Sequence, residues 1–300
     1  MTLYDIPAPA KLNLFLHVTG RRPDGYHALQ TVFRFIDLCD HLHFDLRRDG
    51  RIEREGDTLP GLAPDDDLIV RAARALQQAS GTPLGAQIRC VKNIPSGAGL
   101  GGGSSDAATT LIALNRLWNT GLSRDALMVL ARPLGADVPI FIFGQPAFAQ
   151  GRGDELTEVA LPERAYVVLR PHGSVSTAEI FSAPDLTRNT KPVIISVFAH
   201  WLASGAQEID GLAGNSLFGR NDLEPVVLSR YESIRQMVCG LQKQGFRARM
   251  TGSGSCFFVE FNTQEQASRA RQEISSKMLE GGYESAWVCP GLPQHPLRHW

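Results

Sequence analysis

Apolar residues alternate strictly with other residue types near the start of the chain. Between residues 11 and 18, one side of the alternation collects Leu12, Leu14, Leu16 and Val18, and the other collects Lys11, Asn13, Phe15 and His17. A period of two is typical of a strand that buries one face, so this stretch predicts a half-buried strand. The polar face of most such strands meets solvent. Here Pro-Ala-Pro-Ala over residues 7–10 stiffens the entry, which favours a fixed direction for Lys11.

The rest of the first half mixes short apolar runs with segments of helical period. Residues 65–67 are three aspartates that precede a helix ending at Gly81, in keeping with the usual helix caps. Ser123 caps a further helix over 124–132, which Pro133 stops. A polar hairpin is expected over 41–62. The remaining expected elements are strands over 31–38, 86–92 and 140–143 and a helix that begins near Ser104 or Ser105.

The second half has a different composition, which changes near residue 150. We therefore predict two domains, 1–150 and 151–300, the first carrying the nucleotide site and the second helping to bind the substrate. In the second domain we expect helices packed on one face of an antiparallel sheet. Residues 183–192 resemble an exposed linker. The expected strands cover 165–171, 246–250, 256–261 and 285–289, and the expected helices start at 175 and cover 193–202, 224–244 and 264–279.

Composition and charge narrow the class of protein. The chain has 300 residues, 43% hydrophobic content and a formal net charge of −1, so neither nucleic acid nor an anionic membrane is expected as a partner. Any anionic ligand must be held by a local site. The five cysteines are scattered and odd in number, which favours reduced thiols in a cytoplasmic protein. The first residues do not resemble a signal peptide, and no apolar run reaches 18 residues.

A glycine-rich loop precedes the helix expected near Ser104. Five of the residues between 97 and 103 are glycine, so backbone N–H groups can turn toward one point in front of a helix N-terminus. This arrangement favours a polyphosphate ligand over a simple helix cap, which needs only one polar residue. No lysine follows the glycines, which excludes the nucleotide-triphosphatase loop. Residues 97–102 fit G-x-G-x-x-G, but the acidic residue of a dinucleotide site is absent about 20 positions later.

Candidate chemistry gathers at a few further positions. Asp137 stands between Gly-Ala and Val-Pro, where it is conformationally fixed and partly buried, and Lys11 is the only early lysine on a strand. Such a pair facing a phosphate loop would suit proton abstraction from an alcohol. Tyr26-His27, at a strand mouth, is by itself an ordinary packing pair. The glycines at 252 and 254 form either a plain hairpin turn or a second set of donors opposite the first loop.

Three of these segments together resemble the GHMP small-molecule kinases, the superfamily of galactokinase, homoserine kinase and mevalonate kinase. They are Pro-Ala-Lys-Leu-Asn-Leu over 9–14, Pro-x-x-x-Gly-Leu-Gly-Gly-Gly-Ser-Ser over 95–105 and Thr-Gly-Ser-Gly-Ser over 251–255. The resemblance implies an α+β, two-domain GHMP kinase fold, with an N-terminal α/β domain like that of ribosomal protein S5 and a C-terminal ferredoxin-like α+β domain. Residues 24–27 and 135–139 are most similar to members that phosphorylate the 2-hydroxyl of a diphosphocytidyl alcohol in the non-mevalonate isoprenoid route.

The resemblance also implies roles for individual residues. Asp137 matches the catalytic base, and Lys11 matches the lysine that keeps it ionised and stabilises charge at the reacting oxygens. Tyr26 and Phe181 match the aromatic pair around cytosine, and His27 matches the residue that reads the polar edge of the base. The implied ATP loop is Pro95, Ser96, Gly97, Ala98, Gly99, Leu100, Gly101, Gly102, Gly103, Ser104 and Ser105, and the other implied substrate contacts are Asn13, Phe33, Thr177, Gly252, Ser253 and Gly254.

ATP and Mg²⁺ are therefore the expected co-substrate and metal. No dedicated carboxylate for Mg²⁺ stands out, so phosphate oxygens, water and Ser104 or Ser105 are the expected ligands. Asp106 departs from the pattern, because it adds a negative charge beside the phosphate helix. A monomer or weak homodimer is expected. A homoserine or mevalonate type of kinase, a dinucleotide oxidoreductase and a non-catalytic nucleotide-binding protein remain the alternatives.

Overall fold

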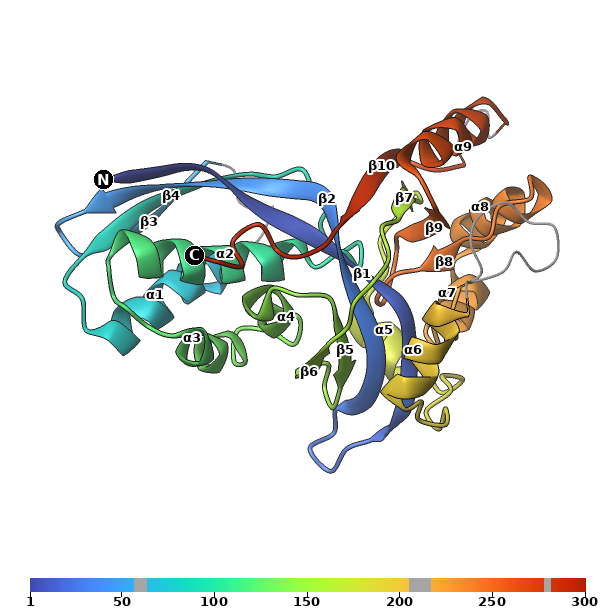
Figure 1. Cartoon of the computed structure of the whole chain (residues 1–300), viewed down its shortest axis with the longest axis horizontal. Helices are drawn as coiled ribbons and strands as arrows, with labels where there is room; N and C mark the ends of the chain where they lie inside the picture. The colour runs from blue at the N-terminus through green and yellow to red at the C-terminus, as the bar shows by residue number, and fades with distance from the viewer. Residues whose placement is uncertain (57–63, 205–216, 278–281) are drawn as a thin grey trace.

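Two long antiparallel strands cross the molecule, β1 (Thr2–Arg21) and β2 (His27–Arg47). They belong to a computed structural model that describes residues 1–56, 64–204, 217–277 and 282–300 (Figure 1). Their register places Lys11 opposite Phe35 and Asn13 opposite Phe33, with an irregularity between Asn13 and Leu16. The strands therefore carry the Lys-Leu-Asn-Leu segment into the middle of the structure.

The prediction that residues 11–18 form a half-buried strand is wrong in one respect, because both faces are covered. Lys11 is 2% exposed and Asn13 is 3% exposed, although they share the face expected to meet solvent. On that same face, Phe15 packs with Phe148 and Phe198. Leu12, on the opposite face, belongs to a cluster with residues of the glycine loop and of strands from the second half. The strand is thus enclosed by residues from both halves of the chain.

The strands form one continuous mixed sheet. Its order is β3-β4-β2-β10-β7-β9-β8, with β1 and β5 also paired to β2 and β6 paired to β5. The hairpin expected over 41–62 is wrong, since residues 41–47 pair with β4 and β3 pairs with β4 in parallel; residues 57–63 lie outside the described part of the chain. The other strands are β3 (Ile52–Glu55), β4 (Gly85–Val91), β5 (Ala147–Gln150), β6 (Glu155–Glu158), β7 (Ala165–Arg170), β8 (Arg249–Met250), β9 (Phe257–Phe261) and β10 (Ser285–Leu292).

Helices of the first half pack against β1, β2 and β4. The helix predicted after the three aspartates is confirmed as α1 (Leu68–Ser80): the Asp67 carboxylate accepts from the Ile69 amide and Gly81 ends the helix with φ +66°. The helix after the glycine loop, α2 (Gly102–Leu117), begins two positions before Ser104. A 3₁₀ turn, η1 (Pro64–Asp66), and α3 (Arg124–Ala131) complete this group together with α4 (Val138–Phe143).

The apolar strand expected over 140–143 is wrong, because these residues belong to the helix α4. Pro139 lies in the first turn of α4, and Gly144 ends it with φ +76°. Every side chain from 138 to 142 is buried, so neither a period of two nor one of 3.6 is visible in the sequence. Proline in the first turn and glycine after the last are typical helix boundaries. The consequence for the site is that Asp137 stands at a helix N-terminus.

The second half contains five described helices beside strands β7, β9 and β10. The single helix expected over 224–244 is wrong, since Tyr231 adopts φ −113° and ψ 94° and separates two helices. The helices are α5 (Thr177–Ser182), α6 (Ile195–Ala203), α7 (Glu224–Arg230), α8 (Glu232–Lys243) and α9 (Gln264–Lys277). No helix in the described parts of the chain combines the length and the apolar character needed to cross a bilayer.

The two halves are joined by strand pairing and by shared cores. Strand β10 pairs with β7 but also reaches β2, where Gly291 lies opposite Ile36. Beyond β10 the chain returns to the first half (Figure 1), where Leu297 packs in the core formed by α1, α2 and β2. Leu16 and Val18 of β1 belong instead to the core of the second half. The division into domains at residue 150 stays a prediction, and the hydrophobic cores cross it.

Candidate active site

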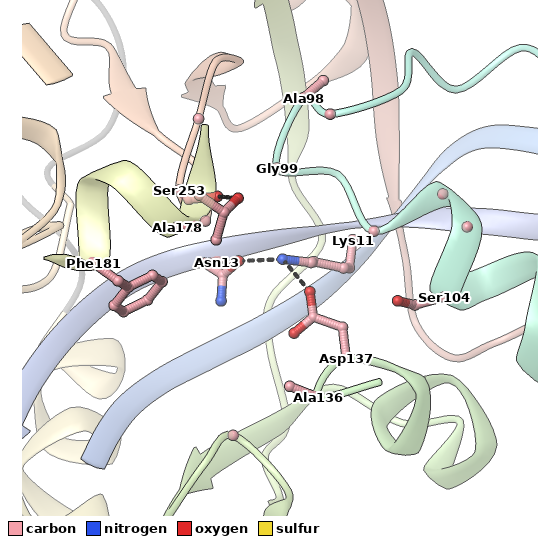
Figure 2. A pocket seen from close by; sticks show the side chains of 18 of the residues that line it. Lys11, Asn13, Ala98, Gly99, Ser104, Ala136, Asp137, Ala178, Phe181 and Ser253 are labelled. Atoms are coloured by element: carbon pink, nitrogen blue, oxygen red, sulfur yellow. Dashed lines mark hydrogen bonds and ion pairs between the residues drawn. The ribbon is translucent and has the colours of Figure 1, made fainter. Parts of the chain in front are cut away.

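A cavity of about 1110 Å³ lies where the elements of the two halves meet. It is lined from the first half by β1, β2, the glycine loop and the segment before α4, and from the second half by α5 and the loop over 252–254. Figure 2 shows part of this lining. All of the site residues expected from the sequence line this cavity except two, Leu100 and Ser105. Leu100 is 1% exposed within a hydrophobic cluster, and Ser105 is fully buried; the idea that their backbone amides meet ATP stays a prediction.

The glycine loop is held between β1 and the late loop. The amide of Lys11 donates to the Leu100 carbonyl at 2.9 Å, and the amide of Cys256 donates to the Ala98 carbonyl at 3.1 Å. Gly99 has φ +76°, and a Cβ there would lie 2.2 Å from the Thr251 carbonyl oxygen. Only glycine permits this approach of two backbones. The segments over 95–105 and 251–255, which are far apart in sequence, are thus in direct contact.

Lys11 and Asp137 meet in the middle of the cavity (Figure 2). The Lys11 Nζ lies 3.1 Å from the Asp137 Oδ2 and donates to the Asn13 Oδ1 at 2.5 Å. Asn13 Nδ2 in turn donates to Thr31 Oγ1 at 2.9 Å, which turns the amide oxygen toward the lysine. A buried ammonium group is costly unless it is paired, and these two oxygens supply the pairing. Asp137 keeps 35% of its side chain exposed, so a ligand in the cavity can reach it.

Three aromatic side chains line the end of the cavity formed by the β1–β2 turn and α5. The rings of His27 and Phe181 lie 5.1 Å apart at an angle of 34°. Tyr26 is 55% exposed, and the Arg152 guanidinium lies over its ring at 4.0 Å from the centroid. Burial lowers the pKa of His27 below its ordinary value, and the positive charges of Arg188 and Arg21 lower it further. The ring of His27 is therefore neutral at pH 7.

The late loop closes the cavity from the second half. The hydroxyls of Thr177 and Ser253 share a hydrogen bond of 2.6 Å, which joins this loop to α5. Asn221 donates to the carbonyls of Met250 and Gly252, each at 2.8 Å, and thereby fixes the backbone of this loop. Asn221 was not anticipated from the sequence, since an isolated asparagine outside any motif carries no signal of this role.

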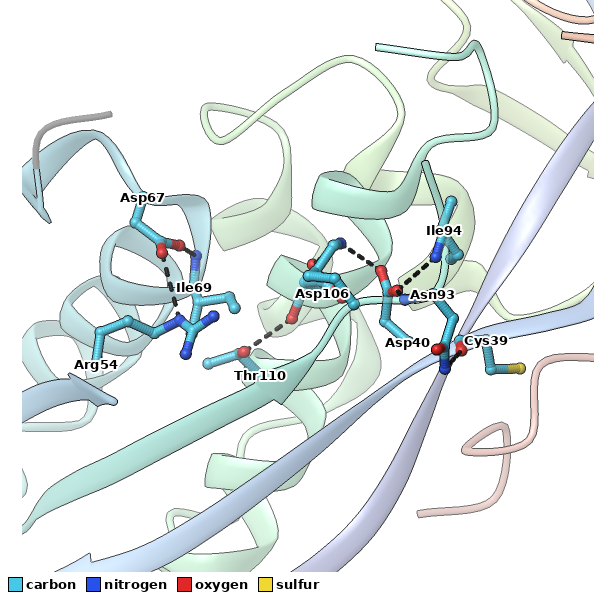
Figure 3. Close-up of polar contacts among 10 residues, drawn as sticks. Cys39, Asp40, Arg54, Asp67, Ile69, Asn93, Ile94, Asp106 and Thr110 are labelled. Carbon is cyan, nitrogen blue, oxygen red and sulfur yellow. Dashed lines mark hydrogen bonds and ion pairs between the residues drawn. The ribbon is translucent and has the colours of Figure 1, made fainter. Parts of the chain in front are cut away.

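Lys92 and Asp106 line a further, polar part of the cavity near α1 and β4, and Asp40 contacts Lys92 without lining the cavity (Figure 3). The Lys92 Nζ donates to Asp106 Oδ2 at 2.7 Å and also to Asp40 Oδ2. Asp40 is fully buried and accepts from the amides of Asn93 and Ile94 at 2.6 and 2.8 Å. Burial raises the pKa of Asp106 to about 7; the Lys92 charge opposes this rise and Asp40 adds to it. The negative charge that Asp106 was expected to add beside the glycine-loop helix is thus reduced by protonation near pH 7, and its carboxylate form is paired with Lys92.

The sequence did not identify Lys92, Asp40 or Arg54 as residues of the site, and it indicated Asp67 only as part of a helix cap and Asp106 only as a charge beside the glycine loop. Arg54 Nε lies 3.4 Å from Asp67 Oδ2, and both residues line the cavity. The one available signal was the placement of Lys92 three residues before Pro95 and of Asp106 directly after Ser105. Opposite charges on the two sides of a loop indicate a possible pair, but only the fold shows that they meet.

Comparison with known proteins agrees with this geometry. Residues 67–145 match the family model of the GHMP kinase N-terminal domain, and residues 206–280 match that of the GHMP kinase C-terminal domain. A solved homoserine kinase from Cytophaga hutchinsonii shares the fold with a TM-score of 0.67 over 98% of this chain and 95% of the other, at 17% identity. Fold and site together define a small-molecule kinase of the GHMP class, which confirms the expected fold.

Closer relatives place the chain within that class. A protein of Bordetella parapertussis named 4-diphosphocytidyl-2-C-methyl-D-erythritol kinase is 58% identical, covering 100% of this chain and 99% of its own. One of the same name from Aromatoleum aromaticum is 52% identical over 99% and 96%. The crystal structure of a 4-(cytidine 5'-diphospho)-2C-methyl-D-erythritol kinase matches with a TM-score of 0.76, 32% identity and coverage of 97% and 99%. The chain belongs to the family of 4-diphosphocytidyl-2-C-methyl-D-erythritol kinases.

Proposed function

We propose that the protein transfers the γ-phosphoryl group of ATP to the 2-hydroxyl of 4-diphosphocytidyl-2-C-methyl-D-erythritol, in the non-mevalonate route to isoprenoid precursors. The observation that supports this most directly is the position of the Lys11–Asp137 pair. It lies in one cavity with the glycine loop and with Tyr26, His27 and Phe181. In Figure 2 the pair stands between Phe181 and Ser104. ATP at the glycine loop and an acceptor alcohol that carries cytosine at the aromatic residues can therefore reach Lys11 and Asp137 from different ends of the cavity.

Asp137 is the proposed general base. Its partly exposed carboxylate accepts the proton of the substrate hydroxyl while that oxygen forms a bond to the γ-phosphorus. The bond between the γ-phosphorus and the bridging oxygen breaks, and ADP leaves with the electron pair. Lys11 holds the carboxylate in place and stabilises the negative charge that is distributed over the reacting oxygens. Asn13 and Thr31 fix the lysine for this task.

The glycine loop is the proposed phosphate site. Helix α2 begins at Gly102, so its free amides and the positive end of its dipole face the loop. The polar residues Lys92, Asp106, Arg54 and Asp67 line the same cavity. They form the proposed site for the nucleoside of ATP. Leu68 and Ile69 add apolar surface there, which suits a purine ring.

The residues present also fit Mg²⁺. This ion prefers oxygen ligands and usually takes a few from the protein and the rest from phosphates and water. Ser104 lines the cavity, and Figure 2 shows its hydroxyl directed toward the space beside Asp137. Ser105 does not fit, because its hydroxyl is buried outside the lining. When bound, the ion neutralises charge on the transferred phosphoryl oxygens. Ser104 is thus the proposed protein ligand.

The end of the cavity formed by the β1–β2 turn and α5 is the proposed cytosine site. Tyr26 and Phe181 supply aromatic faces, and His27 supplies a polar ring nitrogen for the edge of the base. Thr177, Ser253 and Gly252 also line the cavity and are proposed to contact the rest of the substrate. Phe33 contacts Lys11 through its ring, with Nζ 5.5 Å from the centroid.

Product analysis tests the proposal. Purified protein is incubated with ATP, Mg²⁺ and one of three alcohols: the diphosphocytidyl alcohol, homoserine or mevalonate. We expect a monophosphorylated product only from the first, identified by mass spectrometry and ³¹P NMR. Phosphorylation of homoserine or mevalonate with no reaction of the first alcohol would support the corresponding kinase instead. Phe181→Ala should raise KM for the diphosphocytidyl alcohol without changing KM for ATP.

A further inference from the structure

Arg188 connects the two elements that carry the aromatic end of the cavity. Its Nε donates to His27 Nε2 at 3.1 Å, across 161 positions of sequence. Its other nitrogens donate to the backbone carbonyls of Leu186, Phe181 and Ala183, at 3.1, 3.0 and 2.6 Å. The guanidinium is thereby held at the end of α5, and its direction toward His27 is fixed.

This contact determines where His27 carries its proton. A guanidinium donates and never accepts, so the Nε2 that receives its hydrogen bond must present a lone pair. A neutral imidazole has one proton, which then resides on Nδ1. Burial and the charges of Arg188 and Arg21 favour the neutral ring. Within the described residues no protein group pairs with Nδ1 of His27, so this N–H is available to a ligand in the cavity that His27 lines.

We propose that Arg188 is a positioning residue that keeps His27 as an Nδ1–H donor and thereby makes the site select cytosine over uracil. The inference rests on the proposed function. Cytosine presents an unprotonated N3, which accepts a hydrogen bond, whereas uracil carries N3–H. A fixed donor facing position 3 pairs with cytosine and opposes the N–H of uracil. An imidazole free to change tautomer could accept from uracil instead, so selectivity depends on the partner that fixes the ring.

The tautomer can be measured directly. In ¹⁵N–¹H correlation spectra of the full chain, His27 is assigned among the eight histidines by comparison with His27→Gln. We expect the Nδ1–H pattern for His27 in the parent protein and in Arg188→Lys, which keeps a positively charged N–H donor group. Arg188→Met, which has similar length and no donor, should shift His27 toward the Nε2–H form. An Nε2–H ring in the parent protein, or an unchanged ring in Arg188→Met, would overturn the proposal.

Selectivity provides the second readout. Initial rates are compared for the diphosphocytidyl alcohol and its diphosphouridyl analogue. We expect the ratio of kcat/KM to favour cytidine by about ten- to a hundredfold in the parent protein and to approach one in Arg188→Met, mainly through KM. Arg188→Lys should recover most of the ratio. A ratio that stays high in Arg188→Met contradicts the inference, whereas no turnover of the cytidine substrate by the parent protein contradicts the proposed function.

Arg230→Met is the matched control for loss of an arginine beside α5. Arg230 pairs with Asp185 at 2.9 Å and with Glu179 at 3.6 Å, and it makes no hydrogen bond to His27. This variant should lose the ion pairs beside α5. It should leave unchanged both the His27 tautomer and the ratio of kcat/KM for the cytidine and uridine substrates. An equal loss of selectivity in Arg230→Met would assign the effect to the helix and refute a role through His27.

Discussion

The Nζ of Lys11 lies 3.1 Å from the Oδ2 of Asp137, although one residue belongs to β1 and the other precedes α4. The two partners differ in environment: the lysine side chain is 3% exposed and the aspartate side chain is 35% exposed. The buried ammonium is fixed by Asn13 as well, so the pair has one rigid member and one that a ligand can reach. This asymmetry suits a base that must touch its substrate and a lysine that must not move.

Replacing Asp137 by asparagine should abolish most of the turnover. The amide keeps the size of the side chain but cannot take the proton, so kcat should fall by about 10²- to 10⁴-fold. Nucleotide affinity, measured by calorimetry with a non-hydrolysable ATP analogue, should stay within about twofold, because the substitution leaves the glycine loop, the proposed phosphate site, unchanged. Asp125→Asn, on the exposed surface of α3, serves as the control and should behave like the parent protein. Near-normal kcat in Asp137→Asn would exclude the carboxylate as the base.

Replacing Lys11 by methionine should separate activity from stability. The methionine fills similar volume without a buried charge, and Asp137 is exposed enough to be solvated once unpaired. Asn13 loses its hydrogen-bond donor, so we expect the free energy of unfolding in urea to change by less than about 2 kcal/mol. The kcat should nevertheless fall by about 10²-fold or more, because charge at the reacting oxygens is no longer stabilised. A loss of kcat only in proportion to unfolded protein would contradict this assignment.

The contact between the two loops can be tested with a pair of alanine variants. Gly97 and Gly99 have similar φ values, +65° and +76°, so alanine costs about 1 kcal/mol at either position. A Cβ at Gly97 meets nothing within 4 Å, whereas one at Gly99 would lie 2.2 Å from the Thr251 carbonyl oxygen. Gly99→Ala must therefore separate the loops. We expect a much larger rise in KM for ATP in Gly99→Ala than in Gly97→Ala. Equal KM values would show that the contact does not shape the site.

Secondary-structure elements that depend on local rules were predicted well from the sequence. The Asp67 cap and Gly81 set the ends of α1, and the run of glycines predicted a loop in front of a helix, which the structure has before α2; its role as a phosphate site stays a prediction. The stretch over 138–142 failed for a physical reason: a helix buried on all sides has no polar face, so no period reveals it. Likewise, the polar face of β1 resembled a solvent face until the second half covered it.

Contacts between distant segments could not be predicted in this way. Arg188 lies in the stretch over 183–192 that resembles an exposed linker, and only the fold brings it to His27. Lys92 and Asp40 meet across 52 positions for the same reason. The resemblance to known kinases supplied the roles of Tyr26 and Phe181, which the residues alone did not indicate. Positioning residues are therefore the class that the sequence misses most readily.

The buried Asp106 should make stability depend on pH. Its pKa rises from the ordinary value to about 7 in the folded protein, because burial disfavours the charged form. Between about pH 4 and pH 7 the folded protein then holds a proton on Asp106 that the unfolded chain releases, so this group lowers stability as pH increases through that window. Asn at this position cannot ionise, yet its oxygen can still accept from Lys92.

We therefore expect Asp106→Asn to gain stability relative to the parent protein between pH 5 and pH 8, by about 1–3 kcal/mol in urea unfolding. Asp125→Asn, which removes an exposed carboxylate, is the control. Its free energy of unfolding should differ from that of the parent protein by the same amount at pH 5 as at pH 8. A difference between Asp106→Asn and the parent that does not change with pH would mean that Asp106 is ionised throughout. In that case the Lys92 charge would outweigh burial in setting the protonation state of this cluster.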